Sequence, residues 1–403
     1  AVLFVGDANY DYLDALGTGT PNYVPSHISV YDQSASDDNY VYFGSYGILD
    51  SDTSYLEGDR GFDMICSRWP VRSRQEIQTI IDKILRYESA SNFGIWRNRI
   101  TLVADDEHAG SSTLEIIHTV DTEELENEHI PPLFTRDKIY LWEYPHVGRD
   151  KPEVNDAIVE TINDGTLIVN YVGHGNPDVW AHEHVLWRGD DLPRLNNRDR
   201  LPLVFVASCA IGYFDSPSRE GMAEDFLSHA NGGAIGSVAA TRLVYASANA
   251  DFNQETYDQL LYGDSLSICE AVYAAKLARQ YLGGLPAPIT NDRKFLFFGE
   301  PFVKLAIPKL DIEVSADPDT LLALGKTVVT GRVLDETLAT YAYDGVLYVE
   351  VQDSEREKVY RVVNSEGEIV AEVEYAVTGP TIYRGSATVE DGEFSFDFIA
   401  PLD

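Results

Sequence analysis

The sequence has 403 residues, of which 66 are acidic and 30 are basic, so its formal net charge at pH 7 is −36. This charge argues against nucleic acid or an anionic membrane as a partner, because both require clustered Lys and Arg. It fits a soluble protein in a salty or calcium-containing exterior. Apolar residues make up 44 %, which is enough for real cores, and the length predicts two or three domains.

No membrane span is expected, because no stretch reaches the roughly 18 uninterrupted apolar residues that would suggest one. No signal peptide is visible either. Residues 2–5 and 394–398 already have the composition of strands. We therefore expect both ends to be cut from a longer protein, so the missing signal carries no information about location.

Residues 1–97 are predicted to form a first α/β subdomain, with strands at 2–5, 40–43 and 62–66. Ser73 and Glu76 have the spacing of a capping box at the start of a helix. The loop between the strands is acidic, with Asp37, Asp38, Asp50, Asp52, Glu57 and Asp59. Such a loop could hold a structural calcium ion, but it lacks EF-hand spacing, so a solvated acidic loop is favoured.

Residues 98–308 are predicted to form a second, catalytic α/β subdomain. Strands at 99–104, 138–142, 166–172, 201–207 and 234–239 alternate with helices at 112–128, 154–163, 220–230, 250–262 and 266–281. This alternation is typical of a parallel sheet flanked by helices. From 309 to 403 the helical periodicity disappears, and short strands with alternating apolar residues predict an immunoglobulin-like β-sandwich that serves as a spacer or docking module.

Two of the predicted central strands end on chemically useful side chains. Residues 166–172 are followed by Gly173, His174 and Gly175, and residues 201–207 are followed by Ser208 and Cys209. Reactive groups of parallel sheets gather just past the carboxyl ends of the strands. A histidine near a cysteine is the minimum for a thiolate nucleophile, although a lone buried cysteine is usually a small core hydrophobe.

The remaining cysteines, Cys66 and Cys269, are interpreted as buried core thiols, because three cysteines are too few for a disulfide framework. His182 and His184 resemble the spacing of zinc ligands. No third ligand is evident, so no metal site is predicted.

These motifs resemble those of the gingipain-type cysteine peptidases, which are relatives of the caspases and legumains. The resemblance covers nearly the whole chain and lies closest to the sortase branch of type IX secretion. It is carried by residues 170–175, Trp180, residues 207–209 and residues 214–215, with support from residues 5–11, 241–249 and 293–301 and the stretch after Asp319.

The resemblance implies a catalytic dyad and its supporting groups. Cys209 would be the nucleophile and His174 the general base and acid, while the backbone N–H groups of Gly175 and Cys209 would hold the oxyanion. The acid that orients the imidazole is expected at Asp106, where gingipains have a glutamate. Asp105 stands beside it, and a helix N-terminal carboxylate is the alternative reading of Asp106.

Three further residues are expected to bind substrate. Glu115 lies at the offset of the acid that pairs with a basic substrate side chain in gingipains, and a surface helix glutamate is the alternative. Tyr245 stands where the family has an aromatic pocket wall, and an ordinary packing tyrosine is the alternative. Trp180 is included because it follows the histidine block in the same pattern.

The resemblance implies a secreted or surface cysteine endopeptidase that acts on polypeptides through a thioester acyl-enzyme and requires no cofactor for its chemistry. In the sortase branch it would remove C-terminal sorting domains, transfer cargo to an amine-bearing surface acceptor and work with other secretion-system proteins at the outer membrane. The alternatives are a general secreted protease that cuts after basic residues and a non-enzymatic surface scaffold. Sequence does not decide the residue preference or the acceptor.

Overall fold

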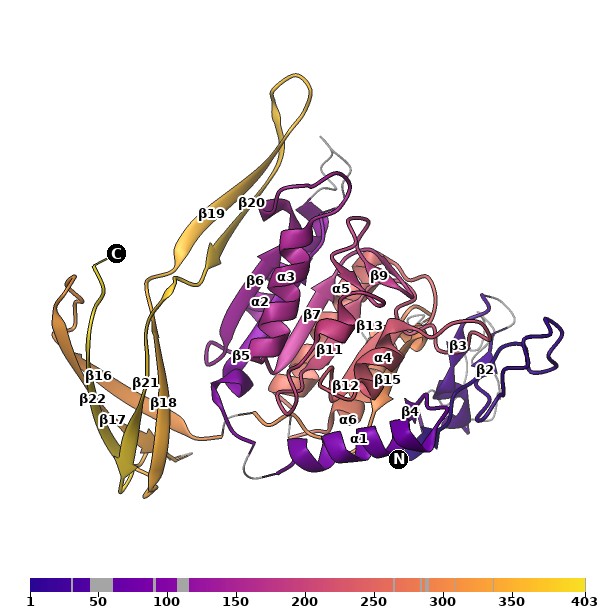
Figure 1. The fold of residues 1–403 in the computed structure, drawn as a ribbon, viewed down its shortest axis with the longest axis horizontal. Helices are drawn as coiled ribbons and strands as arrows, with labels where there is room; N and C mark the ends of the chain where they lie inside the picture. The colour runs from indigo at the N-terminus through magenta and orange to yellow at the C-terminus, as the bar shows by residue number, and fades with distance from the viewer. Residues whose placement is uncertain are drawn as a thin grey trace. The chain divides into compact units, whose positions relative to one another are not determined.

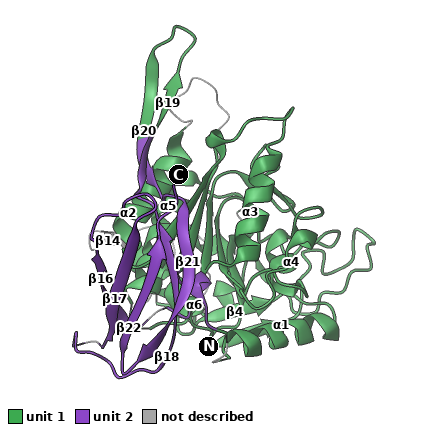
Figure 2. Cartoon of the chain, turned by 60° about the vertical axis from the view of Figure 1, so that its left-hand side comes forward, with its two compact units in different colours: residues 1–92, 99–305, 359–373 green, residues 93–98, 306–358, 374–403 purple. Residues whose placement is uncertain are grey.

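The computed structural model describes most of the chain in two compact units. The described residues are 1–29, 32–43, 61–89, 92–106, 116–263, 265–282, 285–286, 290–307, 309–335 and 337–402. Unit 1 comprises residues 1–92, 99–305 and 359–373, and unit 2 comprises residues 93–98, 306–358 and 374–403 (Figure 2). Among the described residues, we find no helix with the length and apolar character needed to cross a membrane.

An eight-stranded sheet forms the centre of unit 1 (Figure 1). Its strands, in spatial order, are β1 (Val2–Val5), β4 (Cys66–Trp69), β15 (Phe295–Gly299), β12 (Gly236–Ala240), β11 (Leu203–Ala207), β7 (Ile168–Val172), β5 (Arg99–Ala104) and β6 (Thr135–Tyr140). Neighbouring strands are parallel except β12 and β15, which pair antiparallel. The ranges predicted as two α/β subdomains, 1–97 and 98–308, therefore both contribute strands to one sheet.

Helices cover both faces of this sheet, as predicted for an α/β fold. They are α1 (Arg74–Tyr87), α2 (Ile117–His129), α3 (Pro152–Asp164), α4 (Met222–Ser228), α5 (Ala246–Leu261) and α6 (Ile268–Arg279). Val169 and Tyr171 of β7 belong to a buried cluster with Ile158 of α3 and Phe226 of α4. Their neighbour Asn170 exchanges two hydrogen bonds of 2.8 and 3.0 Å with Asn253 of α5. Alternate residues of β7 thus face opposite helical layers, as the two-residue period of a strand requires.

The helix that begins after Ser73 has the predicted serine cap, but its Glu76 reaches back to Arg72, one residue before the cap, where a capping box would use Ser73 itself. The Ser73 hydroxyl accepts the backbone N–H of Glu76 at 3.2 Å, and the Glu76 carboxylate accepts the backbone N–H of Arg72 at 2.7 Å. Two of the N–H groups at the entrance to α1 are satisfied in this way.

Shorter elements join the main ones. They are β2 (His27–Ile28), β3 (Ala35–Ser36), β8 (Gly175–Asn176), β9 (Val179–Trp180), β10 (Leu186–Trp187), β13 (Tyr281–Leu282), β14 (Leu285–Pro286) and the 3-10 turns η1 (Asp37–Tyr40), η2 (Ile95–Asn98), η4 (Leu141–Glu143), η5 (Leu192–Arg194) and η6 (Asp292–Lys294). The strand predicted at 40–43 is wrong, because this stretch leaves η1 without joining a strand.

The acidic loop is not solvated where the structure describes it. Asp37 is buried and accepts a hydrogen bond of 2.6 Å from Arg68. Asp38 is also buried and accepts 2.7 and 2.8 Å hydrogen bonds from Tyr273 and Lys276. Their carboxylates neutralise buried cations inside the fold. The other four acidic residues of the predicted loop lie outside the described residues.

Unit 2 contains a five-stranded antiparallel sheet. Its order is β16 (Asp311–Asp317), β17 (Lys326–Leu334), β22 (Glu393–Ile399), β21 (Thr381–Glu390) and β18 (Gly345–Gln352). The remaining strands, β19 (Arg356–Val363) and β20 (Ile369–Val377), form a separate two-stranded ribbon, most of which clusters with unit 1. The predicted all-β character is confirmed, but the immunoglobulin-like sandwich is not, because the described strands form one larger sheet and a ribbon.

Candidate active site

His174 and Cys209 leave two neighbouring strands at the same edge of the sheet. Strands β7 and β11 are parallel, and Val172 and Ala207 are the last paired residues of each. His174 and Cys209 each stand two positions further along the chain, so they follow adjacent strand ends, which lie about 4.8 Å apart in a sheet. Both residues are partly exposed. The structure therefore places both residues at one accessible edge of the sheet, and the contact between imidazole and thiol remains a prediction.

Cys209 differs from the other two cysteines in its surroundings. Burial raises the pKa of both the Cys66 and the Cys269 thiol, so neither forms a thiolate readily. The Cys209 sulfur, in contrast, is partly exposed and lies 3.5 Å from both the backbone N and O of Val244.

The backbone around His174 is fixed by three hydrogen bonds. Its N–H donates to Asp105 Oδ2 at 2.8 Å, and its carbonyl accepts the Tyr171 hydroxyl at 2.6 Å and the Ala181 N–H at 2.8 Å. The Tyr171 ring stacks on Trp180 at 4.4 Å between centroids. The position of the imidazole therefore depends on buried groups beneath it.

The structure brings Asp105 beside His174 and pairs its neighbour Asp106 with a lysine. Asp106 is buried and accepts a hydrogen bond from the ammonium group of Lys151, which also donates to the Leu141 carbonyl at 2.8 Å. The two carboxylates have oxygens within 4.8 Å of each other, but they differ in their hydrogen-bond donors: Lys151 donates to Asp106, and the His174 backbone N–H donates to Asp105. The orienting role expected of Asp106 remains a prediction, and Asp105 is the carboxylate that the structure bonds to the His174 backbone.

Asp105 is itself in an unusual environment. It is fully buried, and burial raises the pKa of its carboxyl well above the ordinary value, with further increases from the nearby Glu183 and Asp106. The hydrogen bond from the His174 backbone acts in the opposite direction. A Cβ at Gly173 would lie 2.3 Å from Asp105 Cβ, so this glycine is what lets the carboxyl approach the loop.

Gly175 is equally restricted. A Cβ there would lie 2.6 Å from Ser208 Oγ and 3.1 Å from Ile211 Cδ1, so no side chain fits without a shift. The backbone amide of Gly175 is thereby held against the turn that carries Cys209. Its role as an oxyanion donor remains a prediction.

The three predicted substrate-binding residues fall in different places. Trp180 is fully buried beneath the His174 loop, so its ring supports that loop and is not offered to a substrate. Tyr245 is 74 % exposed and directly follows Val244, the residue that contacts Cys209, so its ring is available at the site. Glu115 lies outside the described residues.

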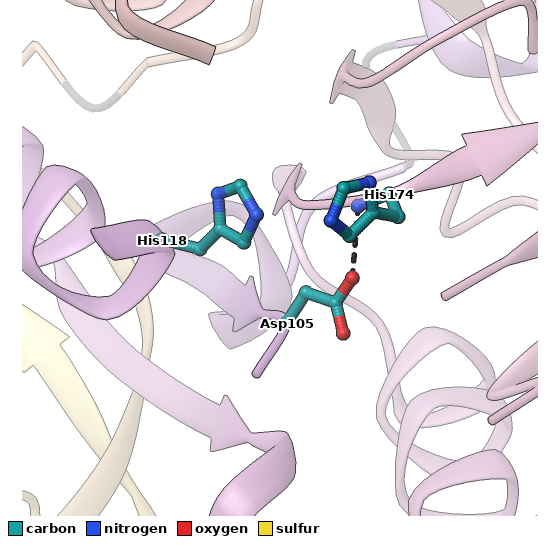
Figure 3. Close-up of side chains that lie close together, drawn as sticks. All are labelled: Asp105, His118 and His174. Carbon is teal, nitrogen blue, oxygen red and sulfur yellow. Dashed lines mark hydrogen bonds between the residues drawn. The ribbon is translucent and has the colours of Figure 1, made fainter. Parts of the chain in front are cut away.

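Two further histidines stand beside His174. His118 of α2 is buried, and its ring lies edge-on at 5.5 Å from the His174 ring (Figure 3). His182 lies 4.8 Å from the same ring, whereas His184 pairs with Asp150 at 3.2 Å. His182 and His184 therefore have different neighbours, as their i, i+2 spacing suggested. His118 was missed as a site residue because a single histidine in a helix carries no distinctive pattern.

Comparisons with known proteins identify the family of the chain. Peptidase family C25 matches residues 1–306. Gingipain R2 of Porphyromonas gingivalis is 24 % identical over 158 residues, which cover 38 % of this chain and 19 % of that protein. The chain thus spans under a fifth of the length of this curated relative.

Solved structures extend the likeness to the fold. The Arg-specific cysteine proteinase gingipain R matches with a TM-score of 0.53 and 17 % identity, over 100 % of this chain and 77 % of that one. Latent PorU from Porphyromonas gingivalis aligns at 18 % identity over 100 % of this chain and 33 % of the PorU chain. The TM-score of that alignment is 0.37, which is too low to establish a shared fold. Because the family match covers most of the sequence, this chain belongs to peptidase family C25.

Proposed function

We propose that the protein is a cysteine endopeptidase that uses Cys209 as nucleophile and His174 as general base and acid. The observation that carries the proposal is the position of both residues, partly exposed, just past the ends of the adjacent parallel strands β7 and β11. Its family and the matching fold of gingipain R, a cysteine proteinase, support the same reaction class.

The reaction proceeds in two stages. The Cys209 sulfur attacks the carbonyl carbon of the scissile peptide, His174 transfers a proton to the leaving amine, and the C–N bond breaks to leave a thioester. Water, activated by His174, then attacks the thioester and releases the acid and the free thiol. The backbone N–H groups of Gly175 and Cys209 would stabilise the oxyanion in both stages.

Asp105 affects the reaction indirectly, because it holds the backbone of His174 and thereby the position of the imidazole. Asp105 Oδ2 accepts the His174 N–H at 2.8 Å, and the Tyr171 hydroxyl, which lies 3.3 Å from the same oxygen, donates to the His174 carbonyl at 2.6 Å. We propose that this network holds the His174 loop, while direct orientation of the imidazole by Asp106 remains an expectation from the sequence resemblance.

The substrate is a polypeptide, and Tyr245 is the described side chain best placed to contact it. Its exposed ring follows the segment that touches Cys209. A basic substrate residue that pairs with Glu115 is the finer expectation, taken from the sequence resemblance. We expect the protein to work outside the cell or at its surface.

The sortase role is the more specific form of the proposal. A thioester that is captured by an amine yields a new amide, whereas capture by water yields an acid. Mass spectrometry of peptide products with and without added glycine amide separates these outcomes. New amide products would support the sortase branch and an amine-bearing acceptor; acid products alone would leave a hydrolytic peptidase.

The proposal is tested by substitution and labelling of the thiol. Cys209→Ala is expected to abolish peptide cleavage. Iodoacetamide should label Cys209 in the folded protein while the buried Cys66 and Cys269 react only after denaturation. Cleavage that persists in Cys209→Ala would refute the mechanism. A folded protein that reacts at Cys209 but cleaves no peptide library would point to the surface scaffold.

A further inference from the structure

Asp105, His118 and His174 form a cluster that the proposed mechanism does not fully use. The three residues come from different elements: Asp105 follows β5, His118 lies in the first turn of α2, and His174 follows β7. Each offers one ligand atom, and these atoms all lie within 4.8 Å of one another. In Figure 3 the His118 and His174 rings lie next to each other, edge-on, with the Asp105 carboxylate beside His174.

These donors match the chemistry of zinc. Two imidazole nitrogens and a carboxylate oxygen are a common set of three protein ligands, with a fourth position left for water. A tetrahedral zinc ion with bonds of about 2.0–2.1 Å spaces its ligand atoms about 3.3 Å apart. The cluster must therefore contract by roughly 1.5 Å at most. Rotation of the partly exposed His174 side chain would supply this movement while its backbone keeps its hydrogen bonds.

The local charge also favours a divalent cation. Carboxylate oxygens of Asp105, Asp106 and Glu183 lie within 4.8 Å of one another, and all three residues are buried. Lys151 pairs with Asp106. The Oδ1 atom of Asp105 has no hydrogen-bond partner among the residues that the structure describes. A buried carboxylate oxygen without a donor gains more from a cation than an exposed one does.

We propose that Asp105, His118 and His174 bind one zinc ion and that this ion reversibly inhibits the enzyme. The inhibition rests on the proposed function, because it requires His174 to be the catalytic base. A ring nitrogen that donates its lone pair to zinc cannot accept a proton from Cys209 or deliver one to the leaving amine. His118 is then the residue that makes the site, because it is the ligand with no role in the peptidase reaction.

Zinc binding is tested first, without reference to activity. Zinc chloride is titrated calorimetrically into the Cys209→Ala variant, so that the thiol cannot serve as a ligand. One ion per chain is expected. A second substitution in this variant, His118→Phe, keeps an aromatic ring and should weaken zinc binding by at least tenfold. Even the loss of a group that only supports a ligand lowers metal affinity by about 10–100-fold. Adding His184→Phe, a matched change at a histidine paired with Asp150, should leave the affinity unchanged.

The proposal is overturned if the Cys209→Ala variant binds no zinc, or if His118→Phe binds it as tightly as its parent. Thermal melting of each variant checks the fold, and His118→Asn replaces His118→Phe if the larger ring prevents folding. If no peptide is cleaved by the wild type, the proposed function fails while the titration still decides whether the zinc site exists.

Inhibition is tested in the protein with Cys209 intact. The ratio of cleavage rates with and without micromolar zinc is measured within each variant, and EDTA is added afterwards. Wild type and His184→Phe should lose most of their activity and regain it with EDTA, whereas His118→Phe should be at least tenfold less sensitive. Equal sensitivity of His118→Phe and wild type would place the inhibiting zinc on Cys209 and His174 alone and would overturn the proposal.

Discussion

Asp105 accepts a hydrogen bond of 2.8 Å from the backbone N–H of His174, although sequence resemblance had pointed to its neighbour Asp106. The two adjacent carboxylates have separate partners: Asp105 accepts the backbone N–H of His174, and Asp106 pairs with the buried ammonium of Lys151. This division makes their substitutions distinguishable.

Asp105→Ala and Asp106→Ala should therefore fail in different ways. The first releases the His174 loop and is expected to lower kcat/KM by about 10²-fold, the loss typical of a misplaced catalytic group. The second leaves Lys151 buried without its partner and should reduce the free energy of unfolding by about 3–5 kcal/mol. Steady-state kinetics and urea unfolding of both variants check this. A larger kinetic defect in a folded Asp106→Ala would return the orienting role to Asp106.

Gly175→Ala tests whether the backbone at this position must stay against the Cys209 turn. The added Cβ would meet Ser208 Oγ at 2.6 Å and push the amide away, so kcat should fall by about 10²–10³-fold, as for the loss of one oxyanion donor. Adding Ser208→Gly removes the closest clash and should recover part of this loss. A single Gly175→Ala variant with wild-type kcat would contradict the assignment.

Trp180 and Tyr245 should separate support from substrate contact. Trp180→Ala removes a fully buried ring that stacks on Tyr171 and should cost about 3–5 kcal/mol of stability. Tyr245→Ala truncates an exposed ring and should raise KM with little change in melting temperature. Steady-state kinetics and thermal melting of the two variants check this. A Trp180→Ala variant that melts like wild type and changes only KM would contradict the assignment.

Asp121 of α2 should make stability depend on pH. Burial raises the pKa of its carboxyl to about 6, above the value of 3.8 for a free side chain, and its Oδ2 has no hydrogen-bond partner within the described parts of the chain. Below pH 4 the carboxyl is neutral in both folded and unfolded chains. As the pH rises from 4 to 6, the Asp121 carboxyl loses its proton readily only in the unfolded chain, and this lowers the free energy of unfolding. The loss persists above pH 6, where the carboxyl is charged in both states.

Asp121→Asn removes this titration. The difference in free energy of unfolding, Asp121→Asn minus wild type, should be more positive at pH 7 than at pH 4. Urea denaturation of both proteins in the presence of EDTA measures it. A difference between the two proteins that does not change with pH would contradict the raised pKa.

The parts of the site that depend on local patterns could be predicted from sequence. The apolar runs before His174 and Cys209 became adjacent strands, since continuous apolar runs of this length suit a sheet covered on both faces. The Ser73 cap formed for the same reason: its partner, Glu76, lies only three residues away.

The parts that depend on distant partners could not be predicted. Whether Asp105 or Asp106 faces the histidine is decided by the residue at which β5 ends and by Lys151, which lies 45 positions along the chain from Asp106. The direction of β15 was equally hidden, because the composition of a strand does not record whether its neighbour runs parallel to it. The predicted sandwich is not confirmed for the same reason. Alternation of apolar residues identified strands in residues 309–403 but did not show how many sheets they form.

The central claim is that His174 promotes the thiolate of Cys209, and the rate of Cys209 alkylation as a function of pH tests it most directly. In the wild type, iodoacetamide should react readily below pH 7. In His174→Ala the midpoint of the profile should rise toward about 8.5, the value of a free thiol. His184→Phe should retain the wild-type profile. Superimposable profiles for wild type and His174→Ala would contradict the account.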